Sequence, residues 1–292
     1  MNSLLVRRYG VSGVAILCLL IGPAAGAAVG PVQVTVASPY SSCTADNVGG
    51  QSGYNYPNSE VEPHLAVNPI NVLNLVAAHQ QDRFSNGGSR GDVVEVSDDG
   101  GLIWSQVTVP GIAICDGGDW QRGTDPWLAF ATNGRVYLVS QSFTGLGVGS
   151  REGFNVVRSD DGGHTWSSPV VIADHIVAAP RYLDDDKVML IADPNDASGD
   201  TVYMVWDRYV NANGWFNRQN DNPKFRYNGG RASVFMSKTI DGGQTWSAPK
   251  EIYRPGSNAW STGPQLAIQP NGTIVLVTNI QVKTKYGAKY TY

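Results

Sequence analysis

The sequence predicts an all-β protein built as a β-propeller of four-stranded antiparallel blades. Beyond the first thirty residues, the apolar residues form short alternating runs without a 3.6-residue period, and glycine is abundant at 34 of 292 residues. In addition, a turn motif and a strand motif both recur along the chain. Recurrence of a whole strand-and-turn unit is typical of sheets repeated around an axis.

The recurring turn has the pattern Ser-x-Asp-x-Gly-x-Thr-Trp, and we call it the Asp-box turn. It occurs at residues 97–104 (SDDGGLIW), 159–166 (SDDGGHTW) and 239–246 (TIDGGQTW). Ile103 replaces the threonine of the first copy, and Thr239 replaces the serine of the third. The aspartate can accept backbone N–H groups, glycine permits positive φ, and the tryptophan can bury its ring between sheets.

The recurring strand begins with EPHLAV at residue 62, DPWLAF at 125, DKVMLI at 186 and GPQLAI at 263, at intervals of 63, 61 and 77 residues. A turn follows, marked by Asn-Gly at 133–134 and 271–272, and then a second strand. The order strand, turn, strand, loop, strand, Asp-box turn, strand describes one blade. The chain therefore predicts three full blades and part of a fourth, spanning residues 58–292.

Residues 1–28 have the layout of a secretory signal peptide. Arg7 and Arg8 precede an apolar run over residues 11–21, and small residues follow at 24–28. The run is shorter than the roughly 18 apolar residues that a membrane anchor needs. We therefore expect a secreted protein with no membrane attachment after cleavage, in which residues 29–57 form an N-terminal segment before the propeller.

Charge and cysteine content narrow the partners and the compartment. Loss of the two leader arginines shifts the formal net charge from −4 to −6, which argues against nucleic acid or an anionic membrane as a partner. Cys43 and Cys115 could pair in an oxidising compartment and tie the N-terminal segment to the first blade, or they could remain free thiols.

Two features leave alternatives open. A strand near residues 32–37 could close a small four-bladed ring, or the chain could be part of a larger propeller. The third unit is longer because of residues 209–230, which hold aromatic and polar side chains without a strand period. This stretch could be a long loop over the site or a disordered insertion.

Strand alternation assigns the candidate site residues to one face. The Asp-box turns lie at one end of the strands, and the starts of the first strands lie at the other. We expect three catalytic carboxyl groups around the channel mouth, with one acid protonating a leaving oxygen and another assisting the nucleophile: Glu62, Asp125 and Asp186. Four arginines are predicted to bind an acidic sugar there: Arg83, Arg122, Arg208 and Arg231. The alternative for each of these residues is an ion pair between blades.

The Asp-box turns, together with EPHLAVNP from residue 62 and TDPWL from residue 124, resemble the BNR, or Asp-box, sialidase-like superfamily over about residues 58–280. The resemblance implies a propeller that usually has six blades, of which this chain would be part. Sialidases of this superfamily use three arginines for the sialic acid carboxylate, an aspartate acid/base, and a tyrosine paired with a glutamate. The Arg-Ile-Pro motif that usually carries the first arginine is absent from this sequence.

The function expected from these features is an exported sialidase-like glycoside hydrolase acting on acidic or other glycans. Two alternatives are a non-catalytic glycan- or protein-binding propeller of the cell surface, and a structural module of a larger surface protein. The four histidines lack zinc-site spacing, and no phosphate-binding or dinucleotide motif occurs, so we expect no metal and no cofactor.

Overall fold

The computed structural model describes residues 30–44, 53–145, 149–178, 182–211, 231–256, 259–284 and 287–291. Residues 33–292 form one compact unit, and residues 1–32 form another, of which only residues 30–32 are described and have no regular secondary structure. The expected signal peptide and most of the 209–230 insertion therefore lie outside the described residues.

The described residues form β-strands and one 3₁₀ turn, η1 (Ile114–Asp116), and consecutive strands pair antiparallel in four groups. Group 1 contains β1 (Glu60–Val67), β2 (Leu75–Arg83), β3 (Ser89–Ser97) and β4 (Ser105–Thr108). Group 2 contains β5 (Arg122–Phe130), β6 (Val136–Thr144), β7 (Arg151–Ser159) and β8 (Val170–Ile176). Group 3 contains β9 (Tyr182–Ala192), β10 (Val202–Asn211), β11 (Arg231–Thr239) and β12 (Lys250–Tyr253). Group 4 contains β13 (Ala259–Ile268), β14 (Ile274–Thr284) and β15 (Gly287–Thr291).

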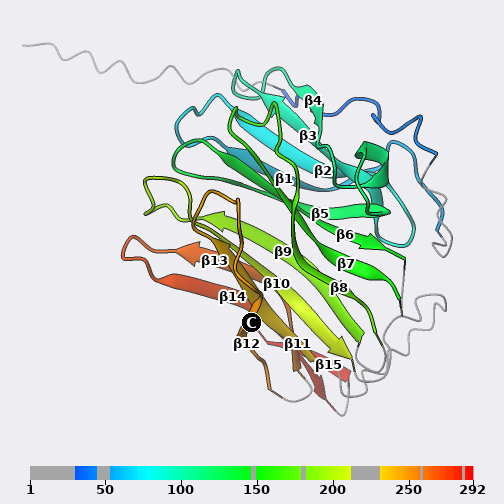
Figure 1. The fold of residues 1–292 in the computed structure, drawn as a ribbon, viewed down its shortest axis with the longest axis vertical. Helices are drawn as coiled ribbons and strands as arrows, with labels where there is room; N and C mark the ends of the chain where they lie inside the picture. The colour runs from blue at the N-terminus through cyan, green and yellow to red at the C-terminus, as the bar shows by residue number, and fades with distance from the viewer. Residues whose placement is uncertain are drawn as a thin grey trace, which may run out of the picture. The chain divides into compact units, whose positions relative to one another are not determined.

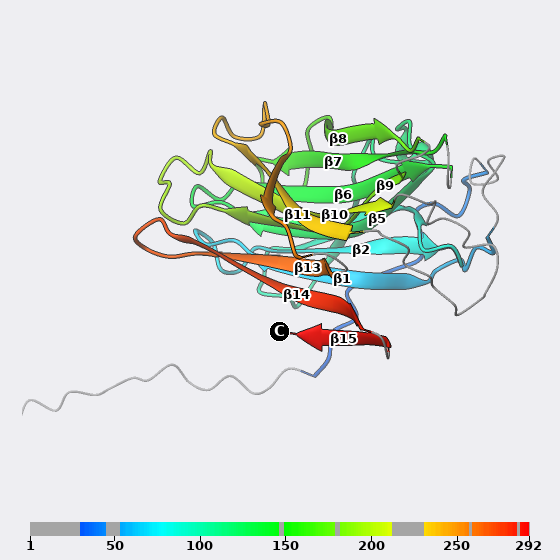
Figure 2. The same ribbon diagram turned by 90° about the horizontal axis from the view of Figure 1, so that it is seen from below.

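The four groups are joined into two sheets by very few pairs. Groups 1 and 2 share an eight-stranded sheet through the pair Ser89–Gly123, and groups 3 and 4 share a seven-stranded sheet through Ala232–Trp260. Figure 1 shows the groups following one another from the cyan strands to the red ones. In Figure 2, β8, β7, β6 and β5 lie as successive rows, as their pairing requires. The all-β prediction is confirmed.

The hydrophobic cores lie between successive groups. Val76 and Val94 of group 1 pack in one cluster with Leu128 and Leu138 of group 2, and all four are buried. Burying such a side chain fully contributes about 1.5–3 kcal/mol. A second cluster joins groups 2 and 3, and a third joins groups 3 and 4. The Asp-box residues Trp166 and Trp246 pack against the first and second clusters, where the sequence predicts such rings.

In each Asp-box turn, backbone N–H groups donate hydrogen bonds to side chains of the same turn. In the second copy, Ser159 Oγ donates to Asp161 (2.7 Å), while Asp161 accepts from Thr165 N (2.9 Å) and Thr165 Oγ1 (2.6 Å). The indole of Trp166 then donates to Gly163 O at 2.9 Å. Although burial acts to raise the pKa of Asp161, these hydrogen bonds lower it to about 2. The aspartate is therefore ionised and held by its own turn.

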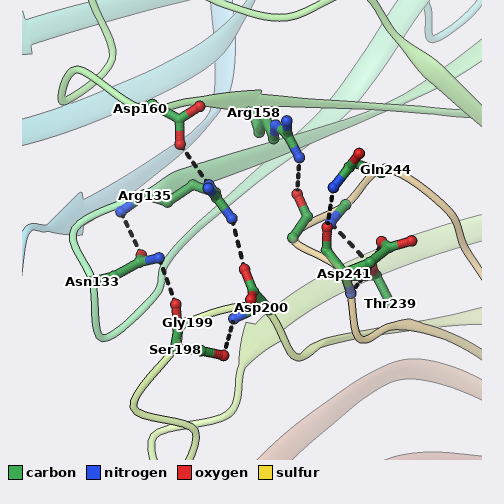
Figure 3. A network of polar contacts seen from close by, with 12 residues as sticks. Asn133, Arg135, Arg158, Asp160, Ser198, Gly199, Asp200, Thr239, Asp241 and Gln244 are labelled. Atoms are coloured by element: carbon green, nitrogen blue, oxygen red, sulfur yellow. Dashed lines mark hydrogen bonds and ion pairs between the residues drawn. The ribbon is translucent and has the colours of Figure 1, made fainter.

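Arginines tie neighbouring groups together at these turns. Figure 3 shows Arg135, which donates to Asp160 of the second Asp-box turn (2.6 Å) and to Asp200 of the β9–β10 turn (3.0 Å). Arg158 of β7 donates to the carbonyl of Gly242 in the third Asp-box turn. Groups 2 and 3 are thus joined by polar contacts at this end as well as by their shared core.

The N-terminal segment is bound by a disulfide between Cys43 and Cys115, which lies in η1 between groups 1 and 2, with the Cα atoms 5.5 Å apart. The buried Tyr40 donates to Asp92 O at 3.2 Å in the same region. Pairing, one of the two alternatives left by the sequence, is therefore correct. The ring closure near residues 32–37 is wrong, because residues 30–44 form no strand and Val32 and Val36 are exposed.

The assignment of faces is confirmed. The β1–β2 turn lies against the first Asp-box turn, since Gly100 N donates to Leu73 O (2.9 Å) and Asn74 Nδ2 donates to Asp98 (3.0 Å). The starts of β1, β5 and β9 therefore lie at the opposite end of the strands. Across the described ranges, no helix is long and apolar enough to span a membrane.

Candidate functional site

Four bulges, one in the first strand of each group, are the most regular feature of the face opposite the Asp-box turns. Each bulge begins with a residue of positive φ: Glu62 (55°), Asp125 (49°), Lys187 (55°) and Gly263 (67°). Each coincides with a register shift against the second strand of its group. Positive φ is uncommon outside glycine and costs about 1–3 kcal/mol when held by the fold, and bulges often aim side chains at sites.

This register corrects one sequence prediction. Asp186 was expected at the position equivalent to Glu62 and Asp125, but it pairs regularly with Asp207, and the bulge begins one residue later at Lys187. The alignment was off by one because the repeat in group 3 lacks the proline that follows Glu62 and Asp125. A cation therefore occupies the third bulge position, next to the predicted acid.

The bulges of groups 1 to 3 face a pocket of about 140 Å³. Group 1 contributes Glu62, Arg83, Asn86 and Gly87. Group 2 contributes Thr124, Asp125, Gln141, Phe143 and Glu152. The start of β9 in group 3 contributes Asp184, Asp186 and Lys187. Pockets for drug-sized ligands have volumes of about 300–1,000 Å³, so this one is suited to a single small ring.

A hydrogen-bonded carboxyl pair occupies one side of the pocket. Gln80 Nε2 donates to Glu62 Oε2 (3.0 Å), to Asp125 Oδ1 (3.2 Å) and to Thr124 Oγ1 (2.7 Å). Thr124 Oγ1 in turn donates to Asp125 Oδ1 at 2.8 Å. Because one amide bridges both acids, the two carboxyl groups are held at a fixed separation, each presented from its own bulge.

Two cations balance this pair from different groups. Lys187 Nζ lies 3.0 Å from Asp125 Oδ2 and 3.8 Å from Asp186 Oδ1. Arg83 donates to Gln80 Oε1 (2.7 Å) and lies 3.7 Å from Glu62 Oε1, which is beyond hydrogen-bond length. The stronger cation contact is therefore made by Asp125.

The pKa values of Glu62 and Asp125 are shifted in opposite directions. The pKa of Glu62 is raised to about 7, first by burial and then by its hydrogen bond to Asp125 and the charge of that residue. Burial also acts to raise the pKa of Asp125, but the charge of Lys187 and hydrogen bonds from Glu62 and Thr124 outweigh it and lower the pKa. One acid thus carries a proton near neutral pH while its neighbour is ionised.

A second pair of carboxyl groups, Glu152 and Asp184, which the sequence prediction missed, lines the same pocket. Glu152 at the start of β7 has its pKa raised to about 9, first by burial and then by the charges of Asp184 and Asp185. Glu152 and Gln141 are both buried pocket residues. The sequence offered only a weak signal for them, since both lie within ordinary alternating strands and resemble core-facing polar positions.

Only one of the four predicted arginines lines the pocket, and it is Arg83. Arg122 is buried, with its guanidinium 3.7 Å from the ring centroid of Phe84 and a hydrogen bond to Gln121 O. Arg208 makes a bidentate pair with Asp185, with both contacts at 2.7 Å. Arg231 is exposed at the start of β11, outside the pocket lining. Arg208 is thus held in an ion pair, but this pair lies within group 3, between β9 and β10, and not between blades as the alternative had it.

The described residues contain no group of three or more histidine, cysteine, aspartate or glutamate side chains that could hold a metal ion.

No protein-family model matches this sequence, and a search of curated proteins finds no match. Solved structures are similar in fold. An α-L-arabinofuranosidase of Fusarium graminearum in complex with an iminosugar inhibitor has a TM-score of 0.52 and 15% identity, over 76% of this chain and 56% of that one. An α-L-arabinanase of Penicillium chrysogenum complexed with arabinobiose has a TM-score of 0.52 and 16% identity, over 82% of this chain and 68% of that one.

A polysaccharide lyase, an ulvan lyase, has a TM-score of 0.51 and 12% identity, over 76% of this chain and 52% of that one. A microbial sialidase has a TM-score of 0.48, too low to support an argument. The chain thus spans about half the length of the arabinofuranosidase and of the lyase. These relatives are β-propeller enzymes, and at such low identities the likeness establishes the fold alone.

Proposed function

We propose that this protein is an exported glycoside hydrolase of the β-propeller type, with Glu62 as its general acid. One observation carries the proposal: a pocket the size of one sugar ring holds two bridged carboxyl groups whose pKa values are displaced in opposite directions. Two titratable groups with diverging pKa values are the usual basis for dividing the roles of acid and base.

In the proposed reaction, Glu62 donates its proton to the glycosidic oxygen as the bond from that oxygen to the anomeric carbon breaks. Asp125 stays ionised and orients the proton of Glu62 through their hydrogen bond. Asp186, beside Lys187 at the start of β9, is the candidate for the second carboxylate. It would either attack the anomeric carbon or remove a proton from the attacking water.

The proposal also includes the propeller architecture of the protein and its export from the cell. Groups 1 to 3 would each be a four-stranded blade, and group 4 would be part of a further blade, in a propeller related to the sialidase-like superfamily. Antiparallel pairing of consecutive strands and cores between successive groups support this. The Cys43–Cys115 disulfide supports export, because disulfides persist mainly in oxidising compartments.

Sialidase activity is the narrower form of the proposal. It requires cations that are available to a sugar carboxylate, and among the four predicted arginines only Arg83 supports it by lining the pocket. Glycosidase activity in general draws its support from the carboxyl groups instead, so it does not depend on the arginines.

The test is hydrolysis of aryl α-L-arabinofuranosides and aryl α-sialosides by the full chain and by Glu62→Gln. A general acid contributes about 10²–10⁴-fold, so kcat/KM should fall by that range in the variant. Glu60→Gln is the matched control, because Glu60 lies in the same strand but outside the pocket lining, and it should keep full activity. Unchanged activity in Glu62→Gln, or no turnover of any glycoside, would contradict the proposal.

A second candidate is a non-catalytic glycan-binding propeller. The direct hydrogen bond between Glu62 and Asp125 favours it, because a glycosidic oxygen would have to displace that contact to reach the proton. Binding of an oligosaccharide without any cleavage by the unmodified chain would support this candidate.

A further inference from the structure

The pocket lining is unusually rich in acids for a site that would receive an acidic sugar. Among the described lining residues, five carboxyl groups face two cationic side chains, Arg83 and Lys187. The five acids come from three groups of strands: Glu62, Asp125, Glu152, Asp184 and Asp186. Because the pKa values of Glu62 and Glu152 are raised, the like charges that a sugar carboxylate would meet come from the three aspartates.

Both cations of the lining already have partners in the protein. Lys187 Nζ contacts Asp125 at 3.0 Å and Asp186 at 3.8 Å. Arg83 donates to Gln80 at 2.7 Å and lies near Glu62. To bind an anion, Lys187 would have to share or give up its contacts with Asp125 and Asp186, and these carboxylates would repel the same anion. Arg83 would have to give up its hydrogen bond to Gln80.

Two of the three remaining predicted arginines are held away from the pocket by contacts of their own. Arg208 is fixed by a bidentate contact to the buried Asp185, and Trp206 Nε1 donates to the same carboxylate at 3.0 Å. Arg122 is buried against the ring of Phe84. Moving Arg208 into the pocket would leave a buried carboxylate without its cation, which is strongly unfavourable.

The uncharged groups of the lining suit hydroxyl groups instead. Gln141 presents an amide, and Glu62 and Glu152 are the two acids whose pKa is raised, so both can donate a proton to a sugar oxygen at neutral pH. Phe143 adds an aromatic side chain to the same wall. Hydrogen-bonding groups beside an aromatic side chain can hold a neutral sugar without any ionic contact.

We infer that the pocket is specific for an uncharged sugar residue and discriminates against sugars that carry a carboxylate. This inference rests on the proposed glycan site and narrows its substrate class. The discrimination comes from the pairing of Lys187 with carboxylates of the protein, together with the three aspartates of the described lining, which outnumber its two cations.

The test measures binding by the full-length Glu62→Gln variant at low salt, with arabinobiose as the neutral probe and sialyllactose as the anionic probe. Arabinobiose should bind at least tenfold more tightly, and its affinity should not change with ionic strength. In Asp186→Asn, sialyllactose binding should rise about fourfold, the effect of one unit charge at about 5 Å in water. Asp119→Asn, an exposed aspartate outside the pocket, is the control and should leave both affinities unchanged.

The outcomes separate this inference from the proposed function. Tighter binding of sialyllactose, or turnover of sialosides alone, would overturn the inference and leave the hydrolase proposal standing. Binding of arabinobiose with no turnover by the unmodified chain would support the inference and contradict the hydrolase. Failure to bind either sugar at millimolar concentration, without turnover, would overturn both.

Discussion

Aspartate and glutamate side chains behave in opposite ways at the two ends of the strands. In the Asp-box turns, Asp161 and Asp241 accept hydrogen bonds from their own turns, and their pKa values are lowered to about 2. In the pocket, the pKa values of Glu62 and Glu152 are raised to about 7 and about 9, with burial as the largest cause. The same functional group is thus ionised where its own turn satisfies it, and keeps its proton to higher pH where it is buried beside other acids.

The difference follows from where the hydrogen-bond donors come from. An Asp-box aspartate obtains its donors within four residues, so the motif alone determines its environment. Glu62 and Asp125 depend on Gln80 and Lys187, which lie on other strands, and only Asp125 has a local donor as well, Thr124. The Asp-box motif alone therefore determines the environment of its aspartate. The environment of the pocket acids depends on contacts between strands.

Among substitutions at the Asp-box end, Asp161→Asn is expected to change the free energy of unfolding most. The variant loses charge-assisted hydrogen bonds in an exposed turn, so the free energy of unfolding should fall by on the order of 1–2 kcal/mol, with kcat unchanged. Because the folded pKa of Asp161 lies below its ordinary 3.8, its contribution is present above about pH 4 and is lost as the pH falls through about 2.

Chemical denaturation at pH 6 and at pH 2 measures both parts of this prediction. The difference in free energy of unfolding between the unmodified protein and Asp161→Asn should be present at pH 6 and much smaller at pH 2. A loss of glycosidase activity without loss of stability would mean that the Asp-box end takes part in the chemistry.

A smaller effect is expected from Ile103→Thr, which restores the threonine that the first Asp-box turn lacks. Thr165 Oγ1 donates to Asp161 in the second turn, whereas Asp99 has only backbone N–H groups and Ser97 as donors. One added hydrogen bond should raise the free energy of unfolding by about 0.5–1 kcal/mol.

Thermal denaturation compares this variant with Leu102→Thr, a substitution of the neighbouring exposed residue that lacks the required geometry. Leu102→Thr should give no gain. Equal gains in both variants would show that removing an exposed apolar side chain, and not the hydrogen bond, is responsible.

The sequence was sufficient to predict the all-β class, the three Asp-box turns and the separation of the two faces, because each depends on local patterns of alternation and turn chemistry. It also identified Glu62 and Asp125, which lie at conspicuous Glu-Pro and Asp-Pro steps. Lys187 was missed because a bulge in β9 shifts the register by one residue, and no proline marks that bulge.

The arginines show a second limit of prediction from the sequence. The order of strands assigns Arg122 and Arg208 to the correct end, but whether an arginine reaches a pocket depends on its partners. Asp185 and Phe84 hold these two side chains, and neither contact can be read from spacing along the chain. Glu152 was missed for the same reason, since its raised pKa comes first from burial and then from acids on β9.

A titration of the carboxyl carbons by ¹³C NMR tests the central claim most directly. The resonances are assigned from their absence in Glu62→Gln and in Asp161→Asn. The account predicts that Glu62 keeps its proton until the pH approaches about 7, while Asp161 is ionised above about pH 2. An ordinary titration of Glu62 near its unperturbed value of about 4.3 would contradict the account, because the carboxyl pair of the pocket would then hold no proton at neutral pH.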